Sequence, residues 1–261
     1  MFSLSFLLAS SAVYVSTYAE EEIDYVRERQ IMVDSQIVAR GIKDKKILDV
    51  VGRIERHKFV PEGMRRYAYE DISLPIGDDE AVPPAYFVSL VAQLSELKGG
   101  EKVLELGLES GYQAAVLADL AKEIYCVEPS ENIALQSEQR LKALGYKNIK
   151  VKTGNMGNGW PEFAPYDVIV ITSPIDFVPK QAVDQLIING RIVMPLREYW
   201  GKKLIVFTKI KKGDGYELTA TLVTPVIGET PSEKWLEENP PLEKERSKWE
   251  AANGSKWMKR K

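Results

Sequence analysis

The sequence predicts an α/β fold with a doubly wound, mostly parallel sheet, an antiparallel hairpin at one edge and extra helices at the N-terminus. The first observation is that apolar strand segments alternate with helical segments through the middle of the chain. Such alternation is typical of parallel sheets, whose crossovers are helices. The second is residues 103–115, where an apolar strand, a glycine turn and a helix follow one another. This order indicates a Rossmann-like nucleoside-binding domain.

The N-terminal elements are expected to be helices between residues 20 and 60, because apolar residues recur about once per helical turn. Gly41 interrupts this pattern, and Asp44 is suited to cap the next helix. A turn at 61–63 and a loop at 78–84 precede a helix expected at 86–97.

The alternating part of the chain then predicts a regular series of elements. They are strand 102–106, helix 111–121, strand 123–127, helix 131–144, strands 149–153 and 168–172, helix 179–187 and strand 190–194. Two further strands, 204–210 and 216–223, are joined through Gly213-Asp214-Gly215. Their short glycine-rich connection predicts an antiparallel pair.

The composition divides the chain into four expected parts: a leader (1–19), an N-terminal helical segment (20–80), a Rossmann-like domain (81–230) and a charged tail with three tryptophans (231–261). The leader has no charge and ends in a small-residue site, Thr17-Tyr18-Ala19. It favours a signal for export to the periplasm or the exterior. An uncleaved anchor in contact with a membrane is the second interpretation; a buried helix of a cytoplasmic protein is the third. The tail is either a solvated extension or a docking segment.

The charge and the rare residues exclude several kinds of site. The 261 residues carry 35 basic and 38 acidic side chains, so we expect no nucleic-acid partner. The single cysteine, Cys126, lies in an apolar strand and is interpreted as a buried structural thiol. The single histidine, His57, excludes a His-rich metal site and is interpreted as a packed or capping residue. We expect no metal ion.

The residues of the glycine turn are candidates to bind a nucleoside. Gly107 and Gly111 would let the backbone approach a ligand, and Glu128 ends the next strand at a spacing typical of an acid that accepts ribose hydroxyls. The alternative for Glu128 is a solvent-facing acid. Glu109 stands where the middle glycine of such a turn is usually found. Its side chain either crowds the ligand or lies in solvent or at the helix N-terminus, where a negative charge is favourable.

A series of short blocks occurs in a fixed order at residues 32–37, 40–42, 56–61, 68–71, 74–77, 111–115, 159–167 and 224–228. In this order they resemble the protein L-isoaspartyl (D-aspartyl) O-methyltransferase family. The resemblance implies a class I S-adenosylmethionine methyltransferase fold and the methylation of isoaspartyl carboxylates in damaged proteins. The methyl ester then closes to a succinimide that can reopen to aspartate. A carboxylate is already a nucleophile, so the protein must align the reactants rather than supply a strong base.

The resemblance also implies the role of individual residues. The S-adenosylmethionine pocket would comprise Glu105, Gly107, Glu109, Gly111, Glu128 and Asn155. Asn155 stands where the family has an acid that accepts from the adenine amino group, and its amide oxygen can still accept. Ala81 and Pro83 stand where the family has a threonine and a serine that face the substrate carboxylate.

The substrate loop departs from the family pattern. Ala81 and Pro83 bring no hydroxyl donors, Pro83 has no N–H, and Asp78, Asp79 and Glu80 add charge that repels a carboxylate. The main hypothesis is a protein-L-isoaspartate(D-aspartate) O-methyltransferase of impaired activity. The alternative is an inactive pseudoenzyme, exported, that keeps the fold as a binding module. A small-molecule O-methyltransferase is a third hypothesis.

Overall fold

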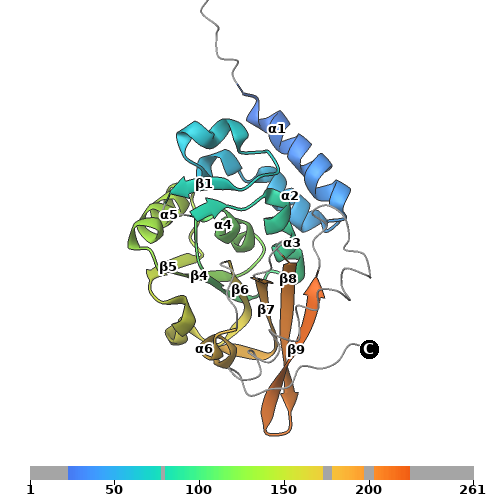
Figure 1. Ribbon diagram of the computed structural model, residues 1–261, viewed down its shortest axis with the longest axis vertical. Coiled ribbons are helices and arrows are strands. Elements are labelled where there is room, and N and C mark those ends of the chain that lie inside the picture. Colours follow the sequence, from blue (N-terminus) through green and yellow to red (C-terminus); the bar gives the residue numbers. More distant parts are fainter. Residues whose placement is uncertain (1–22, 78–79, 173–177, 197–202, 224–261) are drawn as a thin grey trace, which may run out of the picture.

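One sheet of seven strands, in the order β5-β4-β3-β6-β7-β8-β9, forms the centre of the molecule (Figure 1). The computed structural model describes residues 23–77, 80–172, 178–196 and 203–223. The strands are β3 (Lys102–Leu106), β4 (Glu123–Glu128), β5 (Ile149–Thr153), β6 (Tyr166–Ile171), β7 (Leu186–Leu196), β8 (Lys203–Lys212) and β9 (Gly215–Val223). β3 to β7 pair in parallel, and β8 is antiparallel to β7 and β9. This confirms the predicted fold class and its edge hairpin.

The order of the strands changes direction beside β3. β4 and β5 follow on one side of β3, whereas β6 and β7 lie on its other side. Leu106, at the end of β3, is paired with Ile171, at the end of β6. The segments that leave these strands therefore begin side by side at a topological switch point, where open α/β sheets bind their ligands.

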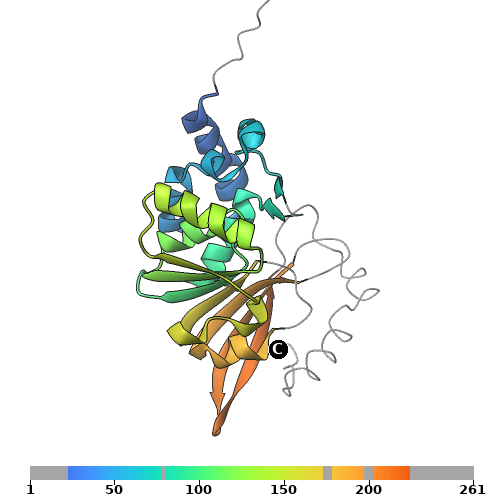
Figure 2. The same ribbon diagram turned by 90° about the vertical axis from the view of Figure 1, so that its left-hand side faces the viewer.

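Helices cover both faces of the sheet (Figure 2). α3 (Ala85–Ser95), α4 (Tyr112–Ala118) and α5 (Glu131–Ala143) pack on one face, and α6 (Lys180–Asp184) packs on the other. Alternate residues of β3 enter the two cores: Val103 packs in the first, and Leu104 in the second. Burial on both faces explains why this strand is a continuous apolar run in the sequence.

The N-terminal helices pack on the same face as α3 and α4. α1 (Tyr25–Met32) continues into a π-helical turn (Val33–Ile37) and a 3-10 turn (Val38–Arg40), which ends at Gly41 with φ +91°. Asp44 caps α2 (Lys45–Arg53) and accepts from the Lys46 N–H at 2.8 Å. The predicted break at Gly41 and cap at Asp44 are both confirmed. Two 3-10 turns follow, at Arg56–Phe59 and Glu62–Tyr67.

Several predicted boundaries differ by a few residues, and two predictions are wrong in a way that changes an element. The expected loop at 78–84 contains strand β2 (Glu80–Val82), which pairs with β1 (Leu74–Gly77) so that Ala81 lies opposite Pro75. A strand of this length has too few residues to show an alternating pattern. The expected helix at 179–187 ends at Asp184, because Leu186 already pairs with Tyr166 of β6. Sheet pairing replaces the last helical turn.

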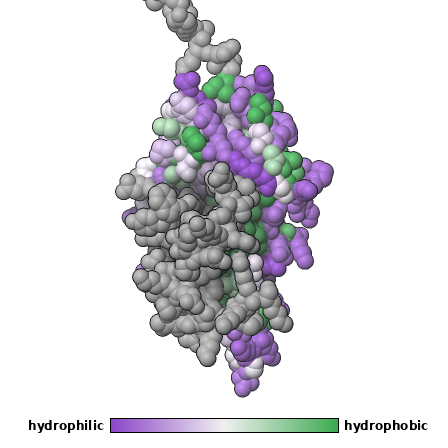
Figure 3. All heavy atoms as spheres, turned by 45° about the vertical axis from the view of Figure 1, so that its right-hand side comes forward, coloured by the Kyte–Doolittle hydropathy of each residue, from purple (hydrophilic) through white to green (hydrophobic). Residues whose placement is uncertain are grey.

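The predicted leader, the tail, and the acids Asp78 and Asp79 lie outside the described residues. Within the described ranges, no helix is long and apolar enough to cross a membrane. On the face drawn in Figure 3, the described surface of the N-terminal region and of the β8–β9 tip is mainly hydrophilic, with apolar residues scattered through it.

Candidate functional site

The glycine loop (residues 107–111) connects β3 to α4 through three left-handed residues. The φ angles are +95° at Gly107, +50° at Glu109 and +81° at Gly111. A Cβ atom on Gly107 would lie 2.1 Å from the Oγ1 atom of Thr172, so glycine is required there by space as well as by φ. The left-handed conformation costs a residue with a side chain about 1–2 kcal/mol. Glu109 is therefore held in it by other contacts.

Glu128 supplies some of those contacts. Its carboxylate is almost completely buried and accepts from the backbone N–H groups of Leu108 at 2.8 Å and Glu109 at 3.3 Å. The other oxygen accepts from the Ser130 N–H at 3.0 Å. The alternative of a solvent-facing acid is wrong. A carboxylate has about four acceptor positions, so these three bonds leave capacity for a ligand hydroxyl.

Helix α5 holds the same loop from the opposite side. The Ser137 hydroxyl donates to the Glu109 carbonyl at 2.7 Å, and the Arg140 guanidinium donates to the Ser110 carbonyl at 2.8 Å. Sequence reasoning missed both residues. The sequence offered one signal for them: Ser137 and Arg140 are three residues apart on the predicted helix and adjoin Leu141, so they lie on the face of the helix that packs against the protein.

Glu105 is also brought to this region, but beneath the loop rather than facing a ligand. It has no exposed surface and accepts from the Gln113 side chain at 3.0 Å. Burial raises the pKa of Glu105 to about 8, and the nearby charge of Glu128 acts in the same direction. The Cys126 thiol, 3.5 Å from Glu105, is fully buried, and burial raises its pKa. The prediction of a buried structural thiol is confirmed.

Asn155 lies beyond the end of β5 and is exposed. Its side-chain oxygen accepts from the Gly157 N–H at 2.7 Å, which caps the short turn Met156–Asn158. The oxygen that the sequence analysis assigned to adenine thus already has a local partner. The oxygen has a second lone pair that can accept from the adenine amino group, so the adenine role stays a prediction.

The β1–β2 hairpin is anchored through its backbone. The Pro83 carbonyl accepts from the Arg56 guanidinium at 2.7 Å, and the Ala68 carbonyl accepts from the same side chain. Arg56 is fully buried, and its guanidinium lies 5.5 Å from the centre of the Tyr112 ring at the start of α4. Pro83 is therefore fixed in place without contributing a hydroxyl group.

A cavity of about 220 Å³ lies among the end of β1, helix α5 and Glu109 of the glycine loop. It is lined on one side by Ile76 and Gly77 of β1, and on the other by Glu109, Ser137 and Arg140. Of the residues predicted to form the site, Glu109 alone lines this cavity; those that do not are Ala81, Pro83, Glu105, Gly107, Gly111, Glu128 and Asn155. The structure thus brings the end of β1, which precedes the predicted substrate loop, close to Glu109 of the glycine loop.

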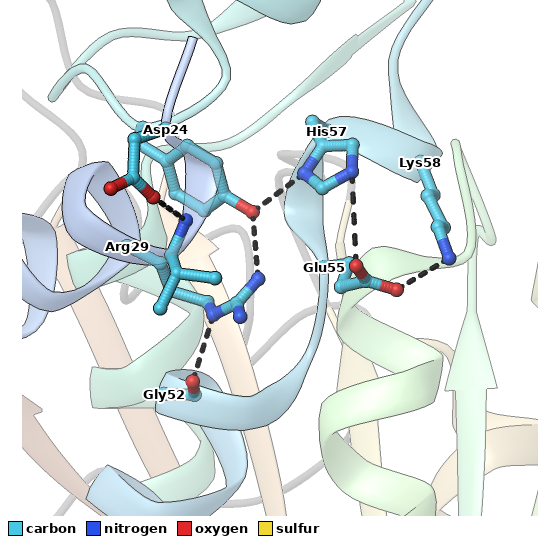
Figure 4. Close-up of polar contacts among 8 residues, drawn as sticks. Asp24, Arg29, Gly52, Glu55, His57 and Lys58 are labelled. Carbon is cyan, nitrogen blue, oxygen red and sulfur yellow. Dashed lines mark hydrogen bonds and ion pairs between the residues drawn. The ribbon is translucent and has the colours of Figure 1, made fainter.

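His57 belongs to a separate packed cluster (Figure 4). Its ring stacks on Tyr25 with centroids 4.0 Å apart, and its Nδ1 atom is 2.8 Å from the Tyr69 hydroxyl. Arg29 donates to that hydroxyl at 3.2 Å, which leaves the hydroxyl proton for His57. Burial lowers the pKa of His57. These contacts confirm a packed histidine that joins α1 to the Arg56–Phe59 turn.

Comparisons with known proteins identify the family of the chain. Residues 27–227 match the family model described as Protein-L-isoaspartate(D-aspartate) O-methyltransferase. Protein-L-isoaspartate O-methyltransferase 2 of Geotalea uraniireducens is 43% identical over 191 residues, which cover 73% of this chain and 87% of that protein. Protein-L-isoaspartate O-methyltransferase 1 of Syntrophobacter fumaroxidans is 41% identical over 184 residues, 70% of this chain and 86% of that protein.

Solved structures give the same answer for the fold. A protein-L-isoaspartate O-methyltransferase superposes with a TM-score of 0.63 at 26% identity, covering 84% of this chain and 70% of its own. A Plasmodium falciparum protein described in the same way, in complex with S-adenosyl-L-homocysteine, gives 0.64 at 19% identity, covering 76% and 95%. The matched region holds the glycine loop, Glu128 and the β1–β2 hairpin, and this chain is a member of the protein-L-isoaspartate(D-aspartate) O-methyltransferase family.

Proposed function

We propose that the chain is an S-adenosylmethionine-dependent carboxyl methyltransferase that acts slowly on isoaspartyl residues of proteins. The observation that carries the proposal is the glycine loop, which lies at the switch point of the sheet and whose backbone is bound by the Glu128 carboxylate. The names of the relatives and the S-adenosyl-L-homocysteine bound to the Plasmodium protein support the cofactor and the substrate.

The residues of the site fit this cofactor. Gly107 allows the backbone to turn at the switch point close to Thr172, Glu128 keeps acceptor capacity for ribose hydroxyls, and Asn155 keeps a lone pair for the adenine amino group. S-adenosylmethionine would supply a methyl group on a sulfonium, which a carboxylate can attack directly. The task of the chain is to align that carboxylate with the methyl carbon and to exclude water.

The rate of transfer is where this chain should differ from its family. The β1–β2 hairpin carries Ala81 and Pro83 where hydroxyl donors are expected. By analogy with oxyanion holes, one lost donor raises the barrier by about 2.7–4 kcal/mol. The same loss favours a second candidate, a binding module that takes up the cofactor without transferring its methyl group.

A methylation assay separates the two candidates. The full chain would be incubated with methyl-labelled S-adenosylmethionine and an isoaspartyl peptide, with the aspartyl peptide as the matched control. Slow labelling of the isoaspartyl peptide alone supports the enzyme. Binding of cofactor without labelling of either peptide over hours contradicts the enzyme and supports the binding module.

We also propose export or membrane anchoring through residues 1–19, which carry no charge. S-adenosylmethionine is made in the cytoplasm, so an exported chain would be separated from its cofactor. Export would therefore count against both candidates above, and it would favour an inactive chain that keeps the fold to bind a different ligand. Sequencing the N-terminus of the mature protein tests it: a start at Glu20 supports a cleaved leader, and a start at Met1 in a soluble fraction contradicts both export and anchoring.

A further inference from the structure

We propose that Ser137 and Arg140 of α5 are positioning residues that keep the glycine loop in its binding conformation although position 109 is a glutamate. The inference rests on the proposed binding of S-adenosylmethionine. It concerns two residues that neither the sequence motifs nor the family resemblance singled out. They act through the loop backbone and not on the reacting atoms.

The need for positioning comes from Glu109. Its φ of +50° is a conformation that glycine adopts freely and that glutamate avoids. Left to itself, Glu109 favours negative φ. Rotation of this residue would also turn the neighbouring peptide groups, and the N–H groups of Leu108 and Glu109 would leave Glu128.

The contacts of α5 oppose this rotation. Ser137 holds the carbonyl of Glu109 at 2.7 Å, and Arg140 holds the carbonyl of the next residue, Ser110, at 2.8 Å. Arg140 also donates to the Ser137 hydroxyl at 3.3 Å, which couples the two side chains. Glu128 of β4 thus binds N–H groups of the loop, and Ser137 and Arg140 of α5 bind its carbonyl groups.

The environment of Arg140 supports this role. Burial lowers the pKa of its guanidinium, and none of the ion pairs between described residues includes it. Within the described residues, its hydrogen-bond acceptors are the Ser110 carbonyl and the Ser137 hydroxyl. A partly buried cation that is satisfied by loop oxygens instead of a carboxylate contributes mainly to the geometry of that loop.

The proposal predicts coupling between positions 140 and 109. When Arg140 is replaced by glutamine, the loop loses the bond to the Ser110 carbonyl, Glu109 is held less firmly in the left-handed conformation, and ligand affinity falls. When position 109 is glycine, that conformation carries no side-chain penalty. The same Arg140→Gln change should then have a much smaller effect.

Titration calorimetry with S-adenosyl-L-homocysteine tests the coupling in the full chain. We expect Kd to rise roughly 10-fold in Arg140→Gln, which corresponds to about 1.4 kcal/mol, and several-fold in Ser137→Ala. Arg140→Lys should recover part of the loss. In the Glu109→Gly background, Arg140→Gln should raise Kd less than about threefold. Lys142→Gln is the matched control, because Lys142 is exposed on the same helix and pairs only with Glu138 among the described ion pairs.

Amide hydrogen exchange without ligand provides an independent test. The N–H groups of Leu108 and Glu109 should exchange faster in Arg140→Gln than in the wild type, while the amides of β3 remain protected. An equal effect of Arg140→Gln on Kd in both backgrounds, or unchanged exchange at these amides, overturns the positioning role. A wild-type chain that gives no heat contradicts the proposed function instead, and the exchange measurement still decides the role of Arg140.

Discussion

The glycine loop and the β1–β2 hairpin lie on opposite sides of one cavity, but their polar groups differ in what they leave for a ligand. In the glycine loop, Glu128 and α5 hold the backbone, and a carboxylate oxygen retains acceptor capacity. In the hairpin, Arg56 holds the Pro83 carbonyl, but positions 81 and 83 present a methyl group and a proline ring. Both regions are therefore well anchored, but positions 81 and 83 of the hairpin offer no side-chain polar group to the proposed substrate, whereas Glu128 keeps acceptor capacity for the proposed cofactor.

This difference implies that a site has two separate requirements: its backbone must be held in place, and its side chains must supply the hydrogen-bond donors and acceptors that a ligand needs. The Arg56 anchor needs only carbonyl groups, which every residue has, so it survives a change of side chain at position 83. A hydroxyl donor aimed at a substrate carboxylate does not survive such a change. A chain can thus keep the shape of a substrate site after losing its donors.

Restoring the donors should have the largest effect. The double variant Ala81→Thr/Pro83→Ser should methylate an isoaspartyl peptide faster than the wild type, by roughly 10²–10³-fold for each donor that reaches the carboxylate. Pro83→Ala is the control, because it removes the ring without adding a hydroxyl. If the double variant binds cofactor normally and its rate is unchanged, the defect lies elsewhere, with Glu109 the next candidate.

Adding a side chain at Gly107 should reduce both the stability of the chain and its binding of S-adenosyl-L-homocysteine. Gly107→Ala places a Cβ atom 2.1 Å from Thr172 Oγ1 in addition to the left-handed strain. We expect a loss of about 2–4 kcal/mol in the free energy of unfolding and no measurable binding of S-adenosyl-L-homocysteine. Gly99→Ala shares the positive φ, +106°, but its Cβ would meet nothing within 4 Å. It should lose about 1–2 kcal/mol and bind normally. Comparable binding by the two variants would contradict the assignment of the loop.

The buried carboxyl of Glu105 should produce a smaller effect that depends on pH. Its folded pKa is about 8 against an ordinary value of 4.5, so above pH 4.5 the unfolded chain releases a proton that the folded chain retains. The stability contributed by this proton is complete below about pH 4.5 and is lost as the pH rises through 8.

Denaturant titrations of the wild type and Glu105→Gln between pH 5 and 8 measure this effect. The free energy of unfolding of the wild type should fall relative to the variant by at least about 1 kcal/mol. Glu101→Gln is the control: partial burial acts to raise the pKa of Glu101, but the backbone N–H groups around its carboxylate together outweigh burial and lower the pKa, so Glu101 stays charged in both states over this range. Parallel curves for the wild type and Glu105→Gln would mean that Glu105 is not held neutral in the core.

The fold was largely predictable, whereas the contacts that hold the site were not. β3 and β5 begin and end at the predicted residues. β3 is buried and therefore reads as a continuous apolar run, whereas β5 alternates apolar and polar residues, and turns flank both segments. The hairpin strand at 80–82 has no such pattern and depends on pairing with β1. The positions of Gly107, Glu109 and Glu128 followed from motif spacing. The hydrogen bonds from Ser137 and Arg140 to the loop carbonyls depend on how α5 packs against the loop. The spacing of residues in the sequence does not reveal that packing.

Binding of S-adenosyl-L-homocysteine to the wild-type chain, measured by titration calorimetry, tests most directly whether the cofactor side is functional while the substrate side is impaired. We expect saturable binding with a Kd on the order of 1 μM, about −8 kcal/mol, that is unchanged in Ala81→Thr/Pro83→Ser. Absence of heat at millimolar ligand would contradict the division between the two regions, and binding restored in Glu109→Gly would identify Glu109 as the cause.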